Sequence, residues 1–491
     1  MNKLLILKTI ADLQSIAENE ETRLEDFLPL KSYSILGDPN KFLILGGRGS
    51  GKTRVFKTLL KENGFRQMIG SQKRLFLPNI SDTDFIAGYN QEGTLFPAQA
   101  TLAHFADDFQ AAAYWAGSVV ILLLRYFEKN EDVQNIASEY FEDTFISQIC
   151  QKKTLKTPSL WISYISENPE MWENFLDDVD EYLVKKERWI FLAYDSLDRL
   201  CPRYADLFPY IRTLLSFWFS HLKRWKRIKC KIFLRNDLYD SEMLSFPDSS
   251  KLGSNCLKLE WDTLSLYRLF IKRMANADDQ ETINYMKMTS GLISEKPDAE
   301  LGYIPTEKEE IIVEFINQMI GRYMGSSPKK GMSYSWAPNH LQDTHGVLSP
   351  RSFIKCYSVA ARKMSERPNE VSLLQGNRLL SPSMLQGAVQ EVSEDRVKEL
   401  QEEYPWLEHL KKAFSGVTLL MERSEFIQKI NMDLWSPEER EKLPALSPQG
   451  IFEMMQKLGI VFVAKDGRVN VPEIYLHGFG MKRKGGLRRP N

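Results

Sequence analysis

The chain has 491 residues, of which 43% are hydrophobic and 26% are charged, so it has enough apolar material for a core and is not disordered as a whole. At about 150 residues per domain, its length suggests roughly three domains. Its 64 Lys and Arg against 65 Asp and Glu give a net charge of −1. This balance excludes a protein that coats nucleic acid by bulk charge, and any polyanion site must be a local patch.

The compartment signals are those of a cytoplasmic protein. The apolar run at residues 4–7 is too short for a signal peptide, and no small-residue cleavage site follows it. The longest apolar stretch, residues 111–124, is shorter than the about 20 residues that cross a bilayer, so we expect a buried helix and no membrane association. Five widely spaced cysteines without a CxxC pair, and six histidines without zinc-ligand spacing, favour a reduced interior and no zinc site.

The first elements in chain order are a helical lead-in and a strand. Residues 1–35 are predicted to be helical from residue 4 to residue 21 and to pack on the domain that follows. Residues 41–45, with apolar side chains at positions 42–45, are typical of a buried strand, and residues 54–60 have helical spacing of their apolar positions.

A GxxxxGK[ST] loop joins this strand to this helix, which is the context that a P-loop requires. Glycines let several backbone N–H groups point at one phosphate chain, and the helix N-terminus adds partial positive charge. Lys52 would reach the β- and γ-phosphates, and the Thr53 hydroxyl would hold magnesium. The predicted nucleotide-binding residues are Gly46, Gly47, Arg48, Gly49, Ser50, Gly51, Lys52, Thr53 and Arg54.

A long helical insertion follows the P-loop. After a turn at residues 90–93, apolar spacing predicts helices at residues 102–127, 132–151 and 161–183. We interpret residues 98–185, approximately, as helices that lie against or above the sheet.

Residues 189–194 form the next apolar strand, and Asp195 follows it directly. A carboxylate at the carboxyl end of a buried parallel strand faces the nucleotide crevice. Asp195 is therefore the predicted Walker B residue, which would hold magnesium together with Thr53. The alternative is an aspartate that only caps a helix.

A third strand is predicted at residues 230–234, and it runs into Arg235 and Asn236. A polar or cationic side chain at this strand end can contact the γ-phosphate or the attacking water, so both residues are sensor candidates. The alternative is again a capping residue before the next helix.

Together these motifs resemble the AAA+/STAND branch of P-loop NTPases, and most of all the KAP-like bacterial ATPases associated with phage defence or mobile elements. The resemblance covers roughly residues 36–365. It implies an α/β fold with a parallel-sheet P-loop core and a helical lid, with ATP and Mg²⁺ as cofactors. In residues 348–353, Ser349 is a good N-cap and Pro350 a good first helical residue, and the resemblance makes Arg351 a sensor 2 arginine.

One position departs from the pattern of these ATPases. They usually carry an acidic residue directly after the Walker B aspartate, where this chain has Ser196. Asp198 is the nearest carboxylate and the alternative base, or else the chain hydrolyses slowly and acts as a switch. Arg199 would serve as an arginine finger to a neighbouring subunit, or would form only a surface ion pair.

The rest of the chain is predicted to form two further parts after a P-loop domain at residues 36–255. Residues 256–380 are the helical lid and linker, and residues 381–491 are a helical domain similar to a winged helix with a basic tail. The evidence for the winged-helix-like domain is a helix from Ser447 to Gly459, followed by an Asp466-Gly467 turn between two β-prone runs. An Asp-Gly turn in this context predicts a β-hairpin. Other helices are expected at residues 392–403, 423–430 and 437–442.

Two basic segments, residues 221–229 and 481–489, are candidates for phosphate contacts. The alternatives are cations at a helix C-terminus and a solvated chain end, respectively.

The sequence therefore predicts a Mg-dependent ATPase that couples ATP binding and hydrolysis to assembly or remodelling, in a bacterial antiphage-defence or mobile-element system. The alternatives are a nucleotide-gated switch or scaffold with slow turnover, and a DNA-binding ATPase of the initiator or transposition type. Expected partners are ATP, further copies of the chain or an effector protein, and duplex DNA at the C-terminal domain.

Overall fold

The structure is a computed structural model that describes residues 1–13, 23–69, 82–149, 154–239, 244, 249–440 and 443–483. The chain divides into two compact units. One comprises Pro29–Leu259 and is called the sheet unit below; the other comprises Met1–Leu28 and Glu260–Asn491 and is called the helical unit. Each unit has its own core of buried apolar side chains.

A five-stranded parallel sheet forms the centre of the sheet unit, in the order β2-β3-β4-β1-β5, so this is an α/β fold as predicted. The strands are β1 (Leu43–Gly46), β2 (Thr83–Tyr89), β3 (Trp189–Tyr194), β4 (Ile228–Arg235) and β5 (Cys256–Lys258). Strand β4 lies between the P-loop strand β1 and the Asp195 strand β3. The carboxyl ends of these three strands therefore meet at one edge of the sheet.

Two of the five strands, β2 and β5, were not predicted from the sequence. β2 is an outer strand and is only half-buried along most of its length, so it lacks the apolar run of a central strand. β5 has three residues, and they fall in the segment predicted to be the lid. The division between the two units consequently falls after Leu259, whose N–H donates to the Leu45 carbonyl at 2.7 Å.

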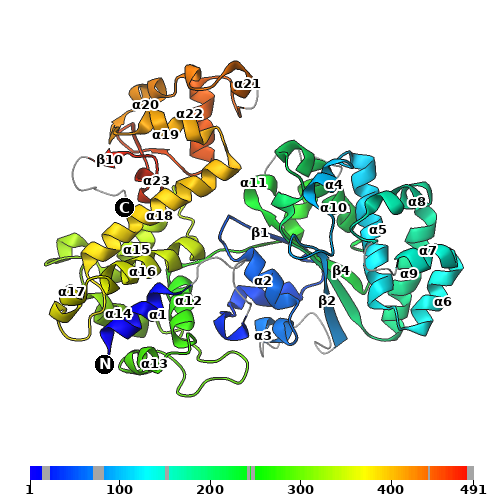
Figure 1. The fold of residues 1–491 in the computed structure, drawn as a ribbon, viewed down its shortest axis with the longest axis horizontal. Helices are drawn as coiled ribbons and strands as arrows, with labels where there is room; N and C mark the ends of the chain where they lie inside the picture. Colours follow the sequence, from blue (N-terminus) through cyan, green and yellow to red (C-terminus); the bar gives the residue numbers. More distant parts are fainter. Residues whose placement is uncertain are drawn as a thin grey trace. The chain divides into compact units, whose positions relative to one another are not determined.

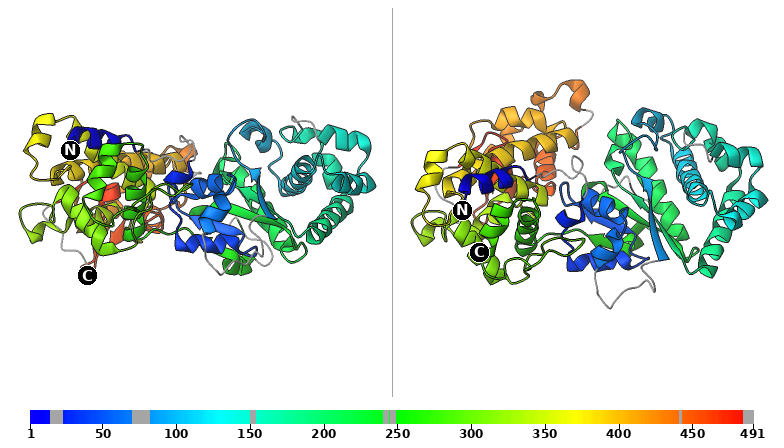
Figure 2. Two further views of the ribbon diagram at one scale, coloured as in Figure 1. Left: turned by 90° about the horizontal axis from the view of Figure 1, so that it is seen from below. Right: turned by 60° about the horizontal axis from the view of Figure 1, so that its bottom comes forward.

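Helices cover both faces of the sheet (Figure 1). On one side lie α2 (Lys52–Leu59) and α3 (Gly64–Ile69), and on the other lies α10 (Leu207–His221) with the inserted helices. α11 (Asn236–Tyr239) continues directly from β4. The insertion lies between β2 and β3 and gathers on one side of the sheet in both views of Figure 2. Its helices are α4 (Gln99–Ala103), α5 (Asp108–Tyr126), α6 (Glu131–Tyr140), α7 (Asp143–Ile149), α8 (Ile162–Glu167) and α9 (Pro169–Lys185).

Each of the three helices expected in the insertion is divided into two. Asp107 caps α5 by accepting the Gln110 N–H at 2.9 Å, and Pro169 begins α9, where its missing N–H costs nothing. Among the described helices, α5 is the one whose length and apolarity would suffice to cross a membrane, and 72% of its apolar window is buried. It packs against α8 and α10 as a core helix, as predicted.

The helical unit contains the N-terminal helix, which corrects the expectation that this helix packs on the P-loop domain. α1 (Lys3–Ala11) packs against α16 (Pro350–Ser365) and α13 (Gln280–Lys287), because Ile6, Leu7 and Ile10 join the apolar core of this unit. The unit also contains α12 (Thr263–Ala275), α14 (Glu309–Ile320), α15 (Ser333–Leu341), α17 (Pro368–Leu373) and α18 (Pro382–Glu403).

The expected boundary near residue 380 is not a boundary between compact units. α18 packs along α16, so the predicted lid and the predicted C-terminal domain share one core. No local pattern indicates this packing, because it depends on pairing two amphipathic helices that belong to different predicted parts of the chain.

The C-terminal elements include the predicted helix and hairpin. α22 (Pro448–Lys457) is capped by Ser447, which accepts the Gly450 N–H, and β8 (Phe462–Val463) pairs antiparallel with β9 (Arg468–Asn470). Gly467 takes a φ of +87° in the turn, as this type of hairpin requires. β7 (Met421–Glu422) completes a three-stranded sheet in the order β7-β9-β8.

The other C-terminal elements are α19 (Leu407–Phe414), α20 (Arg423–Lys429), α21 (Pro437–Arg440), α23 (Glu473–Leu476), β6 (Thr418–Leu419) and β10 (Lys482–Arg483). β6 and β10 pair as a short parallel ladder. Most of the predicted basic tail, residues 484–491, lies outside the described residues, as do residues 441–442 of one expected helix.

Candidate functional site

The predicted P-loop connects β1 to α2 within the sheet unit. Gly49 and Gly51 adopt φ values of +75° and +97°, which residues with a Cβ rarely tolerate. A Cβ on Gly46 would lie 2.3 Å from the Ser50 Oγ, so the chain also needs glycine where it leaves the strand. The loop delivers the N-terminus of α2, whose first-turn N–H groups have no acceptor within the helix, to the carboxyl edge of the sheet.

Lys52, the first residue of α2, reaches back across this loop. Its Nζ donates to the carbonyl oxygens of Gly46 and Gly47, each at 2.9 Å. Burial lowers the pKa of Lys52 to about 8, although Asp195 and Asp198 oppose the shift by favouring the charged form. The ammonium is thus held inside the curled loop, where a P-loop lysine contacts phosphate.

Asp195 follows β3 and is buried, with 3% of its surface exposed. Its N–H donates to the Tyr89 carbonyl at 3.0 Å, which fixes the end of β3 against β2. Burial raises the pKa of Asp195 to about 6, against the opposing effects of a hydrogen bond from Thr53 and of the Lys52 charge. The two predicted magnesium ligands therefore touch each other, although 142 residues separate them in the chain.

A third part of the site is Arg235, the last residue of β4, which is 7% exposed. Its Nε and Nη2 donate to the two carboxylate oxygens of Asp237 at 3.0 and 2.7 Å. Its Nη1 lies 3.3 Å from the Asp198 Oδ2. The candidate sensor arginine is thus ion-paired with the candidate base, while the other sensor candidate, Asn236, is solvent-exposed.

The residue after Asp195 is Ser196, in the left-handed region with a φ of +59°. Its Oγ lies 3.4 Å from the Asp195 Oδ2. A short 3₁₀ helix, Leu197–Arg199, follows and carries Asp198. Arg199 is exposed, and its carbonyl accepts a hydrogen bond from the Gln99 Nε2 of α4 at 2.8 Å.

Arg351 lies in the helical unit. As predicted, Ser349 caps α16 and Pro350 begins it, so Arg351 stands in the first turn. Its Nη1 lies 3.4 Å from Glu399 of α18. The structure thus brings together Lys52, Thr53, Asp195, Asp198 and Arg235 in one unit, and places Arg351 in the other.

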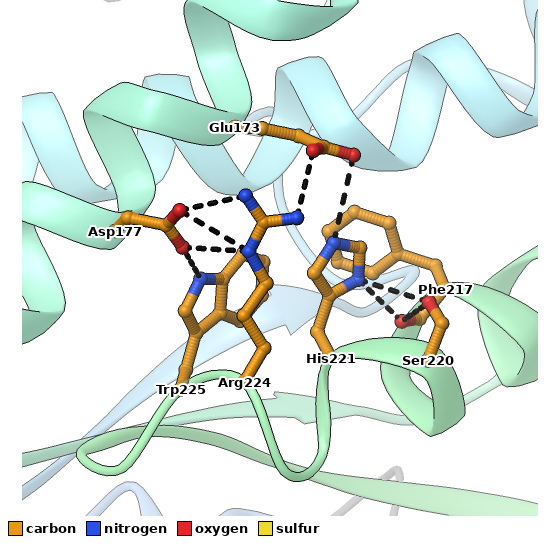
Figure 3. Close-up of polar contacts among 7 residues, drawn as sticks. All are labelled: Glu173, Asp177, Phe217, Ser220, His221, Arg224 and Trp225. Atoms are coloured by element: carbon orange, nitrogen blue, oxygen red, sulfur yellow. Dashed lines mark hydrogen bonds and ion pairs between the residues drawn. The ribbon is translucent and has the colours of Figure 1, made fainter.

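The basic segment at residues 221–229 is engaged within the protein (Figure 3). Arg224 forms ion pairs with Glu173 and Asp177 of α9, and the Trp225 Nε1 donates to Asp177 at 2.8 Å. Lys229 Nζ donates to the Leu222 and Trp225 carbonyls beyond the end of α10. These contacts engage Arg224 and Lys229 within the protein, and those of Lys229 fit the interpretation as cations at a helix C-terminus. Lys223 and Lys226 of the segment are exposed.

Sequence reasoning missed Asp237, which holds Arg235, and Gln99, which holds the segment after Asp195. The position of Asp237, two residues after the arginine that ends β4, was a usable signal for an ion pair. Gln99 gave no such signal, because its partner is a backbone carbonyl 100 residues away in the chain.

The sheet and this loop define an α/β protein with a P-loop at the carboxyl edge of a parallel sheet. No family model matches the chain, and no curated protein matches it. Among solved structures, it is similar to the ORC2 protein of Aeropyrum pernix in its ADPNP–ADP complexes, at 12% identity over 88% of this chain and 83% of that one. The TM-score is 0.34, which is too low for this likeness to support a function.

Proposed function

We propose that the chain is a cytoplasmic, magnesium-dependent ATPase that couples ATP binding and hydrolysis to assembly or remodelling. The observation that carries this proposal is the meeting of Thr53 and Asp195 beside Lys52. A hydroxyl, a carboxylate and an ammonium at the mouth of a P-loop form the donor set expected for a metal-bound triphosphate. A bacterial antiphage-defence or mobile-element setting remains part of the proposal through the sequence resemblance alone.

In this mechanism the loop N–H groups and Lys52 bind and orient the β- and γ-phosphates. Thr53 and Asp195 would hold Mg²⁺, which when bound neutralises charge on the two phosphates. Water attacks the γ-phosphorus as the bond to the bridging oxygen breaks, which gives ADP and inorganic phosphate. A proton leaves the water, and Asp198 is the carboxylate proposed to accept it; Arg235 stabilises charge on the departing phosphate.

A second candidate, the slow nucleotide-gated switch, is favoured by two observations. Ser196 supplies a hydroxyl where related ATPases supply an acid, and Asp198 is occupied by an ion pair with Arg235. A nucleotide-gated switch predicts tight ATP binding with little turnover, whereas an ATPase predicts steady-state release of phosphate.

A third candidate, duplex DNA binding, rests on the β8–β9 hairpin beside α22. It predicts binding that weakens steeply as salt increases.

The test of the nucleotide site is Lys52→Ala, with Lys61→Ala as the matched control. Lys61 is an exposed lysine just beyond α2, and its substitution removes the same charge outside the loop. We expect K52A to weaken magnesium–ATP binding roughly ten- to a hundredfold, since a charge-assisted contact is worth about 1.5–3 kcal/mol, and K61A to leave it unchanged. Calorimetric titration and phosphate release measure both. Equal affinities of K52A and wild type for ATP would refute the nucleotide site.

A further inference from the structure

Arg235 is a buried cation at the end of β4, and among the described residues the carboxylates of Asp237 and Asp198 contact it in different ways. Asp237 takes the guanidinium in a two-pronged arrangement, at 3.0 and 2.7 Å, whereas Asp198 approaches a single nitrogen at 3.3 Å. A two-pronged pair fixes the plane of a guanidinium as well as its position. The Asp237 contact therefore sets the direction of the side chain, and the Asp198 contact is the weaker of the two.

The charges of these residues act directly on the P-loop. Asp195, Asp198 and Asp237 favour the protonated form of Lys52, while Arg235 disfavours it, so all four lie within electrostatic reach of the ammonium. Among the described residues, three carboxylates and two cations therefore lie near one another at this edge of the sheet. A terminal phosphate that arrives at Lys52 consequently meets repulsion from Asp198 and attraction from Arg235.

Phosphate is a stronger partner for Arg235 than Asp198 is. A γ-phosphate carries more negative charge than a carboxylate and offers oxygens that match two guanidinium nitrogens. The single, longer contact to Asp198 is the one that such a phosphate replaces, while the Asp237 contact keeps the guanidinium plane in place.

We propose that Asp237 is the positioning residue for Arg235, and that the γ-phosphate of a nucleoside triphosphate displaces Asp198 from Arg235. This inference rests on the proposed nucleotide site. The exchange makes the Arg235–Asp198 pair a sensor of the third phosphate, because a diphosphate lacks the group that displaces Asp198. Asp237 and Asp198 thus act in opposite directions on the same arginine.

The displaced segment has a defined connection to the inserted helices. Asp198 lies in the 3₁₀ helix Leu197–Arg199, whose Arg199 carbonyl accepts the hydrogen bond of Gln99 from α4. Release of Asp198 removes the ion pair from the middle of this short helix, while α4 still holds its last residue, Arg199. When the third phosphate is lost, Asp198 pairs with Arg235 again. The hydrogen bond from Gln99 to Arg199 connects this change to α4, at the start of the insertion.

The experiment measures the affinities of the full chain for ADP and for a non-hydrolysable ATP analogue, both with magnesium, in wild type, Asp237→Asn, Asp198→Asn and Asp466→Asn. D466N is the matched control, since Asp466 pairs with Arg468 two residues away, is exposed, and leaves an Asn-Gly turn of the same preference. Thermal unfolding of each variant checks that it is folded.

We expect D237N to weaken binding of the ATP analogue by roughly tenfold, the loss of about one charge-assisted contact between Arg235 and the γ-phosphate, with ADP affinity unchanged. D198N is expected to strengthen binding of the analogue several-fold with ADP again unchanged, and D466N to alter neither. A purely structural role of Asp237 would weaken both nucleotides equally, and that result overturns the inference.

Shifts of D237N and D198N in the same direction also overturn it. If D237N does not fold, D198N decides alone, and an unchanged preference between the two nucleotides is then the negative result. Wild-type protein that binds neither nucleotide would refute the proposed function itself. Wild-type binding with unaltered preferences in both variants would refute only the inference.

Discussion

Asp180 is a buried carboxylate of α9, with 5% of its surface exposed, and it organises the start of β4. Its Oδ2 accepts the N–H of Lys226 at 2.7 Å, and its Oδ1 accepts those of Arg227 and Ile228 at 2.6 and 2.8 Å. Three successive backbone donors therefore depend on one side chain from the insertion. The Arg227 carbonyl in turn accepts the Ile190 N–H of β3 at 3.1 Å, so the same contact sets where β4 meets β3.

Asp180→Ala should destabilise the sheet unit by about 3–5 kcal/mol. Each buried donor left without an acceptor costs about 1–3 kcal/mol, and the total stays below three full costs because some of the three N–H groups can then reach water. Asp180→Asn keeps one carbonyl oxygen, enough for the pair of donors on Oδ1, but turns an amide NH₂ toward the Lys226 N–H. Its expected cost is roughly 1–2 kcal/mol. Glu173→Gln is the control, because its ion pair with Arg224 is partly exposed and worth at most about 1 kcal/mol.

Hydrogen exchange of the full chain is the suitable assay, since a protein of two compact units need not unfold in a single step. Peptides that cover β4 should lose protection in D180A far more than in D180N, while peptides from α16 in the helical unit keep theirs. Equal protection of β4 in D180A and wild type would refute the reasoning. Equal losses in D180A and D180N would show that the charge, rather than the number of acceptors, is what stabilises this turn.

Two further predictions concern Gly117 of α5 and His221 at the end of α10. Gly117→Ala would place a Cβ 2.3 Å from the Trp161 ring, so we expect the free energy of unfolding, measured in urea, to fall by about 1–3 kcal/mol. The control is Gly387→Ala, at a helix glycine whose added Cβ would lie 3.7 Å from its nearest neighbour, and it should raise that free energy by up to about 1 kcal/mol. A stabilised G117A would contradict this. Burial lowers the pKa of His221, which stacks on Trp225, below its usual 6.5. The unfolded chain then binds this proton more readily than the folded one, so stability is lost as pH falls through 6.5, and His221→Phe should show a smaller drop in urea midpoint between pH 7.5 and 5.5. Equal drops in both proteins would exclude His221 as the cause.

Much of the fold was predictable because the three central strands contain apolar runs, at residues 42–45, 189–194 and 232–234. β1, β3 and β4 are buried along nearly their whole length, and each is followed by a recognisable polar signal. β2 lacks such a run because it is an outer strand, and β5 is too short to produce one. Helix breaks in the insertion were also missed, since they depend on local caps within otherwise periodic sequence.

The candidate site residues were proposed from the sequence one by one, but the pairing among them was not. The P-loop spacing and a carboxylate after a buried strand single out Lys52, Thr53 and Asp195 as candidates without knowledge of strand order. The pairing of Arg235 with Asp198 requires knowing that β4 lies beside β3, which no local pattern encodes. Parallel pairing between distant segments is decided by the assembled sheet rather than by either strand.

The strand order also has a consequence for how the protein is made. β1 pairs only with β4 and β5, so on the order of 180 residues must be synthesised after Gly46 before its first partner begins at Ile228, which takes roughly 10–40 s at about 5–20 residues per second. During that time an entirely apolar strand has no neighbour, a state that invites aggregation. Nascent chains of this protein are therefore expected to need a chaperone that shields the P-loop strand while the insertion folds, and slowed translation is expected to lower the soluble yield.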